Sequence, residues 1–248
     1  MFVDCTGSGD IDLCDLAAKC GPRTRAVLPV YLWGRGGDPA ALTAFARKRG
    51  LRVVEDACQA HATLAGGRPL GTFGDLGCFS LKDGKILWSG EGGYILTSDD
   101  ELAATCRAYC SHWMTPPPGQ APLARLGNNY RLAEPLAAIA RANLARFGDL
   151  ARQRHAQATR MLTAVAPAPG LTEVVPHAGE AWNGSRRCGV SACLTRAGSA
   201  GAWPTAAFRT ASAASAWSAA TSGPCSPRSA RLRAGPPRTW SIPLSVSC

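Results

Sequence analysis

Apolar and polar positions along the first 184 residues follow two periods, one typical of strands and one typical of helices. Short apolar runs predict buried strands at residues 24–34 and 51–60 and two further strands at 77–83 and 92–98. Between the first two runs, DPAALTAFARKRG predicts a helix, with Asp38 as N-cap, Pro39 at the first helical position and Gly50 directly after the end.

Two further helices are predicted between residues 98 and 165. The segment SDDELAATCRAYCSHW begins with a capping residue and has acidic residues in its first turn. A longer helical pattern runs from Leu132 towards Val165, with apolar residues at Leu136, Ile139, Leu144, Phe147 and Leu150. Because strands and helices alternate, the predicted fold class is α/β, with a mostly parallel sheet covered by helices.

Residues 185–248 have a different composition, and neither period continues through them. About 70% of these residues are Ala, Ser, Arg, Gly or Pro, and the segment contains eight arginines but no lysine, aspartate or glutamate. One interpretation is a disordered basic tail. The interpretation we prefer is out-of-frame translation of a GC-rich gene, because a disordered tail rarely carries three tryptophans and four cysteines.

The net charge of +10 comes mainly from this tail, since the first 184 residues carry 19 basic and 17 acidic residues. The front region therefore gives no reason to expect a nucleic-acid partner. No run approaches the roughly 18–20 apolar residues of a membrane span, and the start lacks the features of a signal peptide, so we expect a cytoplasmic protein. The cysteines show no C-x-x-C pair, so we expect no metal site.

Candidate chemistry gathers where two predicted strands end. The run LRVVEDACQA brings Glu55, Asp56 and Gln59 to one strand end, where ligands bind in open α/β sheets. A buried carboxylate needs a cationic partner, and the protonated ring nitrogen of pyridoxal phosphate (PLP) is one such partner. That cofactor also needs a lysine amine, and Lys85 follows an apolar strand at a glycine-rich turn. Taken singly, Asp56 also suits a strand-end cap, and the glycines also suit an ordinary tight turn.

The combination of motifs is more specific than its parts. VVEDACQAHAT is followed by GTFGDLGCFSLKDGKILWSGEGGYILTSDDELA. Together they resemble the DegT/DnrJ/StrS family of sugar aminotransferases, which are PLP enzymes of the aspartate-aminotransferase fold (fold type I). The resemblance covers roughly residues 2–184, and its motif core is residues 53–97. It implies that the α/β region is a PLP-transferase large domain.

The resemblance also implies roles for individual residues. Lys85 is expected to be the Schiff-base lysine, and Asp56 matches the acid that pairs with the pyridinium nitrogen. Gln59 matches the amide beside the ring and its 3-hydroxyl, and Ser80 matches a phosphate-binding hydroxyl. The segment LGNNYRLAEPLAAI resembles the family's G-x-N-x-R pattern. It implies that Asn129 reaches the phosphate of the cofactor in a partner subunit, so that the active unit is a homodimer.

Two residues are weaker candidates for the substrate side. His112 falls where the family usually has a histidine after a helix, a position where many histidines are only structural. Lys82 lies three residues before Lys85 and is expected to line the substrate or phosphate side, or to face solvent. Lys85 is the stronger candidate for the catalytic lysine.

The sequence also departs from the family pattern. Family members carry a phosphate-binding segment upstream of the position of Met1, and the small C-terminal domain is expected to begin at EVVPHAGEAWNG and then to be lost. The expected organisation is a partial PLP-binding large domain at 1–130, a long helix and the start of a small domain at 131–184, and the tail at 185–248.

The resemblance implies a transaminase that moves an amino group from glutamate or glutamine to a keto-sugar, such as a nucleotide-linked deoxysugar, or to an aminocyclitol precursor. Antibiotic or polysaccharide biosynthesis is the expected setting. A few relatives use PLP for dehydration, but they have histidine in place of the lysine, and Lys85 argues against that reaction. The other alternative is a catalytically inactive fragment or pseudogene product of such an enzyme.

Overall fold

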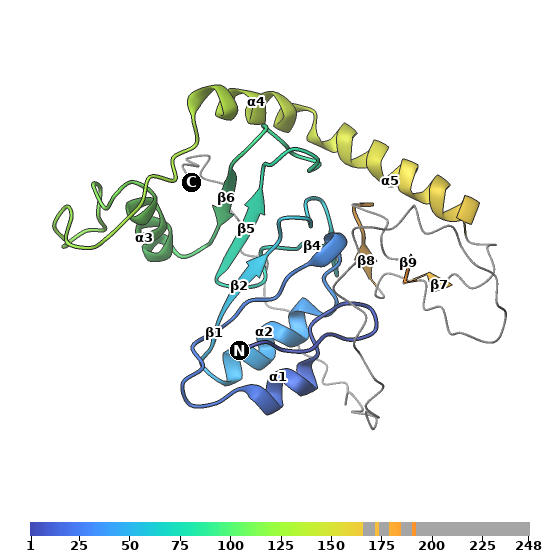
Figure 1. Cartoon of the computed structure of the whole chain (residues 1–248), viewed down its shortest axis with the longest axis horizontal. Coiled ribbons are helices and arrows are strands. Elements are labelled where there is room, and N and C mark those ends of the chain that lie inside the picture. Colours follow the sequence, from blue (N-terminus) through green and yellow to red (C-terminus); the bar gives the residue numbers. More distant parts are fainter. Residues whose placement is uncertain (166–171, 174–178, 185–189, 192–248) are drawn as a thin grey trace, which may run out of the picture.

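The computed structural model describes residues 1–165, 172–173, 179–184 and 190–191 (Figure 1). Its main sheet has the strand order β1-β2-β5-β6. β1 and β2 are parallel, as are β2 and β5, while β6 runs antiparallel to β5. The strands are β1 Ala26–Val27, β2 Arg52–Asp56, β5 Leu76–Ser80 and β6 Gly93–Leu96. The predicted α/β class with a mostly parallel sheet is confirmed.

The helices of the described residues are α1 Leu13–Lys19, α2 Pro39–Lys48, α3 Asp100–Cys110, α4 Glu134–Ala145 and α5 Phe147–Val165. The predicted cap of α2 is confirmed, whereas α3 is capped by Asp99, one residue after the Ser98 that begins its predicted segment. The Asp38 side chain accepts a hydrogen bond from the Ala41 backbone N–H at 2.8 Å, and Asp99 caps α3 in the same way. Gly50 follows α2 with a φ of +64°, a conformation that glycine adopts without strain.

Two small antiparallel sheets complete the described strands. β3 Leu64–Ala65 pairs with β4 Arg68–Pro69 and with β8 Glu180–Ala181. β7 Thr172–Glu173 pairs with β9 Val190–Ser191. The pairing of β8 joins the end of the expected small-domain segment to a hairpin that follows β2 in the chain. The domain boundaries at 130 and 184 stay predictions, and the tail hypotheses fall largely outside the described residues.

The prediction of one buried strand at 24–34 is wrong in its extent. β1 covers only two residues, and one isolated bridge joins Val30 to Asp56. Pro29 has no N–H to donate to a ladder, and after it the chain enters the short 3-10 helix η1 Leu32–Gly34. Leu28 and Val30 are 60% and 49% exposed, so this run is not buried on both faces.

The prediction of one long helix from Leu132 towards Val165 is also wrong. Arg146 has non-helical dihedrals (φ −114°, ψ 15°) and separates α4 from α5. Gly148, two residues later, weakens helix continuation. Ile139 and Leu144 are 39% and 41% exposed, so the apolar stripe that suggested a single buried face is only partly covered.

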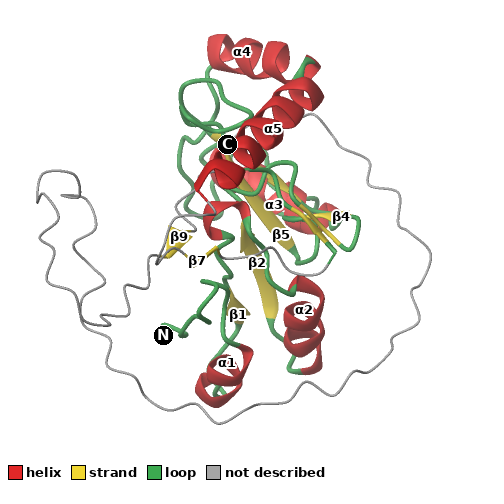
Figure 2. Ribbon diagram, turned by 90° about the vertical axis from the view of Figure 1, so that its right-hand side faces the viewer, coloured by secondary structure: helices red, strands yellow, loops and turns green. Residues whose placement is uncertain are grey.

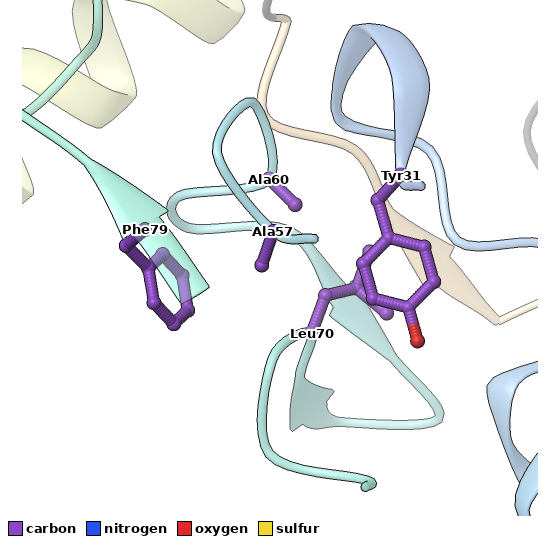
Figure 3. Close-up of a cluster of buried hydrophobic side chains, with 5 residues drawn as sticks. All are labelled: Tyr31, Ala57, Ala60, Leu70 and Phe79. Atoms are coloured by element: carbon purple, nitrogen blue, oxygen red, sulfur yellow. The ribbon is translucent and has the colours of Figure 1, made fainter. Parts of the chain in front are cut away.

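Two apolar clusters hold the described region together. One contains Leu16, Val27 and Leu42, and fixes α1 and α2 near the start of the sheet (Figure 2). The other lies under the turn that follows β2, where the side chains of Tyr31, Ala57, Ala60, Leu70 and Phe79 converge (Figure 3). Burial of apolar surface stabilises this turn, which carries Gln59 and directly follows Asp56.

Candidate active site

β2 and β5 are neighbouring parallel strands that end at the same edge of the sheet, with Asp56 paired in register to Cys78 (Figure 1). The turn after β2, residues 57–63, and the loop after β5, residues 81–92, therefore start from the same edge. The expected residues Asp56, Gln59, Ser80 and Lys85 all lie on these two strand ends and their following segments. This edge is the position at which open α/β sheets bind ligands.

Asp56 is held by the backbone on both sides. Its N–H donates to the Pro29 carbonyl at 2.9 Å, and its carbonyl accepts from the Tyr31 N–H at 3.0 Å. The half-buried side chain accepts from the Cys58 N–H at 3.1 Å. Burial, then the hydrogen bond to Asp56 and its charge, raise the pKa of the Cys58 thiol to about 12, while the Lys85 ammonium opposes this shift.

The neighbouring acid, Glu55, has a structural role. It is fully buried, and its carboxylate accepts from the Tyr31 hydroxyl at 2.7 Å and from the backbone N–H groups of Gly71 (2.9 Å) and Gly74 (2.5 Å). Burial raises the pKa of Glu55, and these three hydrogen bonds oppose that rise. Glu55 thus secures the 71–74 loop, and only Asp56 is left for the site.

The loop after β5 places Lys82 and Lys85 in different environments, one exposed and one half-buried. Leu81 N–H donates to the Gly92 carbonyl and Ser89 N–H to the Leu81 carbonyl, both at 2.8 Å, so the loop closes on itself. α4 supports it from outside, because the buried Asn143 donates from Nδ2 to the Trp88 carbonyl at 2.8 Å. Within this loop Lys82 is exposed and Lys85 is half-buried. Lys85 is also near enough to act electrostatically on Cys58 and His61.

His61 belongs to this site, although its position in the sequence gave no signal of this. Its ring is 3% exposed and lies 5.1 Å from the ring of Phe79 and 5.9 Å from that of Tyr94. Burial, and then the Lys85 ammonium, lower the pKa of His61 to about 4. Its Nε2 is buried without a hydrogen-bond partner among the described residues.

Gln59 is fixed through its side-chain oxygen. Oε1 accepts from the Trp33 backbone N–H at 3.1 Å, and the Gln59 carbonyl accepts from Asn183 Nδ2 at 2.9 Å. Because Trp33 N–H can only donate, the amide oxygen faces Trp33 and the NH₂ group faces away. Asn183 is a second residue that the sequence did not indicate, because only the fold brings it to the turn.

The remaining expected residues lie at the borders of this cluster or beyond it. Ser80 Oγ accepts from the Lys82 N–H at 3.2 Å, and the Ser80 hydroxyl hydrogen stays available to a ligand. His112 and Asn129 are exposed and belong to the segment between α3 and α4. The His112 N–H donates to the Asn128 carbonyl at 3.1 Å, and Asn129 Oδ1 accepts from Arg131 Nε at 3.0 Å. Their roles remain predictions.

The residues present fit PLP. Asp56 offers a half-buried carboxylate for a ring nitrogen, Gln59 an NH₂ group, and Lys85 a half-buried amine. The buried Nε2 of His61 without a partner is a polar atom that a bound group could satisfy. Among the described residues no group of His, Cys, Asp or Glu side chains is arranged to hold a metal ion, and no helix is long and apolar enough to cross a membrane.

Comparison with known proteins matches this chain to aminotransferases, both by a family model and by a solved structure. The model of the DegT/DnrJ/EryC1/StrS aminotransferase family matches residues 1–195, which extends beyond the expected limit at residue 184. A solved structure, S. venezuelae DesV in complex with a ketimine intermediate, matches with a TM-score of 0.67 and 33% identity, over 73% of this chain and 48% of that one.

Three curated relatives are similar over part of their length. A UDP-N-acetyl-3-dehydro-alpha-D-glucosamine 3-aminotransferase of Acidithiobacillus ferrooxidans is 40% identical over 54% of this chain and 37% of the relative. A dTDP-3-amino-3,4,6-trideoxy-alpha-D-glucose transaminase of Micromonospora megalomicea subsp. nigra is 37% identical over 67% and 44%. An L-glutamine:2-deoxy-scyllo-inosose aminotransferase of Streptoalloteichus tenebrarius is 36% identical over 52% and 32%. The chain thus spans less than half the length of these relatives.

Proposed function

Because the chain belongs to the DegT/DnrJ/EryC1/StrS aminotransferase family, we propose that it acts as a PLP-dependent aminotransferase. Its substrate would be a keto-sugar, most simply a nucleotide-linked deoxysugar, or an aminocyclitol precursor. Relatives named for nucleotide-sugar and inosose amination support both substrate classes. The relative that uses L-glutamine supports glutamine or glutamate as the amino donor.

The observation that carries the proposal is the placement of Lys85. A half-buried amine lies within electrostatic range of the turn that bears Cys58 and His61, directly after the Asp56 carboxylate. The neighbouring Lys82 is exposed on the same loop. A primary amine at the same sheet edge as a carboxylate and an amide NH₂ group matches what a PLP enzyme needs on its protein side.

The candidate residues of this chain would each have a separate role in binding PLP or in proton transfer. When bound, PLP supplies an electron sink for the carbon next to the transferred amino group. The Asp56 carboxylate accepts a hydrogen bond from the ring nitrogen and keeps a proton there. Gln59 donates from Nε2 beside the ring, and the Ser80 hydroxyl donates to the phosphate. The Lys85 amine acts as the base that takes and returns the proton at the donor's α-carbon.

The partner and the compartment are also proposals. We propose a homodimer in which Asn129 of one subunit reaches the phosphate site of the other, because Asn129 is exposed and lies outside the cluster around Lys85. We further propose that the protein works in the cytoplasm, in antibiotic or polysaccharide biosynthesis. The polysaccharide setting has support from a similar spore coat polysaccharide biosynthesis protein of Bacillus subtilis.

The direct test is nitrogen transfer. The purified chain with PLP is incubated with ¹⁵N-labelled glutamate or glutamine and a nucleotide-linked keto-sugar, and the sugar is examined by mass spectrometry. We expect ¹⁵N in the sugar with the native protein and none with Lys85→Ala. Absence of transfer with every keto-sugar and cyclitol substrate, from a protein that binds PLP through Lys85, would favour the catalytically inactive alternative.

A further inference from the structure

Residues 179–184, here called the strap, lie against the turn that carries Gln59 and His61. β8 within the strap pairs antiparallel with β3, and Glu180 Oε1 accepts from the Gly36 N–H at 2.7 Å. The contact is non-local, since 124 positions separate Asn183 from Gln59. None of the motifs in the sequence assigns the strap a role in the site.

Asn183 binds the turn with its side-chain amide. Nδ2 donates to the Gln59 carbonyl at 2.9 Å and to the His61 carbonyl at 2.6 Å, so each of its two hydrogens has an acceptor on the turn. Asn183 is only 3% exposed, and its backbone N–H donates to Thr63 Oγ1 at 3.3 Å. In a buried position these two carbonyls would be costly to leave unpaired.

Trp182 reaches the same turn through Trp33. Its Nε1 donates to the Trp33 carbonyl at 2.9 Å, and the Trp33 N–H donates to Gln59 Oε1 at 3.1 Å. A closed circuit of hydrogen bonds and peptide bonds therefore joins Trp182, Trp33, Gln59 and Asn183. The circuit fixes the Gln59 backbone at its carbonyl and the Gln59 side chain at its oxygen. Within the described part of the chain, the Gln59 NH₂ group has no hydrogen-bond partner.

The packing around the strap leaves little space for another arrangement. A Cβ on Gly34 would lie 2.5 Å from Asn183 Oδ1 and 2.7 Å from the Gln59 carbonyl oxygen. On the other side, a Cβ on Gly184 would lie 2.8 Å from the Ala158 Cβ of α5. The strap is thus held between the η1 segment and α5, with glycine at both close contacts.

We propose that Asn183 and Trp182 are positioning residues for PLP, acting through Gln59 and the 57–63 turn. They present the Gln59 NH₂ group to the cofactor and keep the turn after Asp56 in one conformation. The inference rests on the proposed function, because the place of PLP beside Gln59 follows from that function. The strap itself touches neither the cofactor nor the substrate in this account.

The test compares two strap variants of the full chain. Asn183→Leu keeps the size of the side chain and removes both donors, whereas Glu180→Ala removes a strap hydrogen bond that does not reach the turn. PLP affinity is measured by absorbance titration, and thermal stability without PLP is measured in parallel. We expect Asn183→Leu to raise the PLP Kd by about tenfold over Glu180→Ala, the scale of losing the one hydrogen bond that the Gln59 NH₂ group is proposed to donate to the cofactor. Equal Kd values for the two variants would overturn the proposal.

A double-mutant cycle separates positioning from general destabilisation. In a Gln59→Ala background the Gln59 amide is gone and Asn183 can act only by ordering the 57–63 turn, so Asn183→Leu should weaken PLP binding by clearly less than the roughly tenfold expected in the native chain. An equal, roughly tenfold loss in that background would show that the Gln59 amide does not carry the effect and would overturn the proposal.

Hydrogen exchange of the PLP-free chain measures the order of the 57–63 turn directly. It therefore tests the role of the strap without depending on whether the chain binds PLP. Asn183→Leu should speed exchange of the backbone amides of residues 57–63 more than Glu180→Ala does. Failure of the native chain to bind PLP through Lys85 would refute the proposed function. Unchanged exchange of residues 57–63 in Asn183→Leu would refute the ordering role of the strap, whatever the result with PLP.

Discussion

Glu55 and Asp56 are adjacent acids at the end of β2, and the strand places them on opposite sides. Glu55 is fully buried with three hydrogen-bond donors around it, while Asp56 is half-buried and accepts from Cys58 N–H. The sequence predicted acids at this strand end. Assigning Asp56 to the site needed the resemblance, because both faces of a buried parallel strand are covered and the alternation carries little information.

His61 illustrates what the sequence could not supply. A histidine five residues after Asp56 has no pattern of its own, and its importance comes from contacts with Phe79 and Tyr94 on neighbouring strands. Those contacts exist only once β5 and β6 have paired. By contrast, the sequence singles out Lys85, because its spacing after Ser80 belongs to a specific motif, and its catalytic role stays a prediction.

At the residue scale, His61 should make stability depend on pH. Its pKa is lowered to about 4 in the folded chain, against about 6.5 when unfolded, mainly by burial and also by Lys85. As pH falls below 6.5 the unfolded chain binds the proton first, so the stability present above pH 6.5 is lost towards pH 4. We expect a loss of about 2 kcal/mol in the free energy of unfolding between pH 7 and pH 5, measured by urea unfolding without PLP.

The variants for this measurement are His61→Phe and His112→Asn. His61→Phe should remove this part of the pH dependence, whereas His112→Asn, at an exposed position with a φ of +57° that asparagine tolerates, should keep it. Identical pH dependence in the native chain and His61→Phe would contradict the assignment of a neutral buried imidazole.

At the scale of elements, residues at helix starts predicted element bounds better than the apolar periodicity did. The caps of α2 and α3 depend on residues next to the helix start: the predicted Asp38 cap is confirmed, and the α3 cap is Asp99, one residue later than predicted. The strand at 24–34 was predicted too long because the apolar run was given more weight than Pro29. The single helix was wrong because apolar spacing continues across Arg146, although the backbone does not.

The close approach of β5 to the 71–74 loop gives an element-scale prediction. A Cβ on Gly77 would lie 1.9 Å from the Gly71 carbonyl oxygen, so the loop that Glu55 secures would have to move. We expect Gly77→Ala to lower the free energy of unfolding by about 2–3 kcal/mol, as overpacking does, measured by urea unfolding. Gly21→Ala, where a Cβ meets nothing within 4 Å, is the control and should change it by less than about 0.5 kcal/mol. Equal free energies of unfolding for the two variants would contradict this prediction and would show that the 71–74 loop moves without loss of stability.

At the scale of the whole molecule, the site combines segments far apart in the sequence. Residues 53–97 contain the motif and could be assigned from the sequence, but the strap could not, because its role depends on a contact across 124 positions. The family match to residue 195 includes the strap. β8, within the segment expected to begin the small domain, pairs with the hairpin after β2, which no periodicity indicated.

The proposed dimer predicts complementation between inactive subunits. Lys85→Ala lacks the amine, and Asn129→Ala lacks the phosphate contact that we propose acts across the interface. A mixed dimer contains one site with Lys85 from one subunit and Asn129 from the other, so mixing the two variants should restore PLP binding at that site. Absorbance titration of the mixture, beside each variant alone, measures this. Binding no better than in the separate variants would indicate that Asn129 acts within its own subunit or not at all.

Lys85 and Asp56, at the same edge of the sheet, are proposed to form the PLP site, and absorbance tests this proposal most directly. The purified full chain is scanned with added PLP beside Lys85→Ala and Lys82→Ala, the latter removing an exposed lysine from the same loop. The account predicts a band near the visible edge in the native chain and in Lys82→Ala, its shift on adding glutamate, and its absence in Lys85→Ala. A band that persists in Lys85→Ala, or none in the native chain, would contradict it.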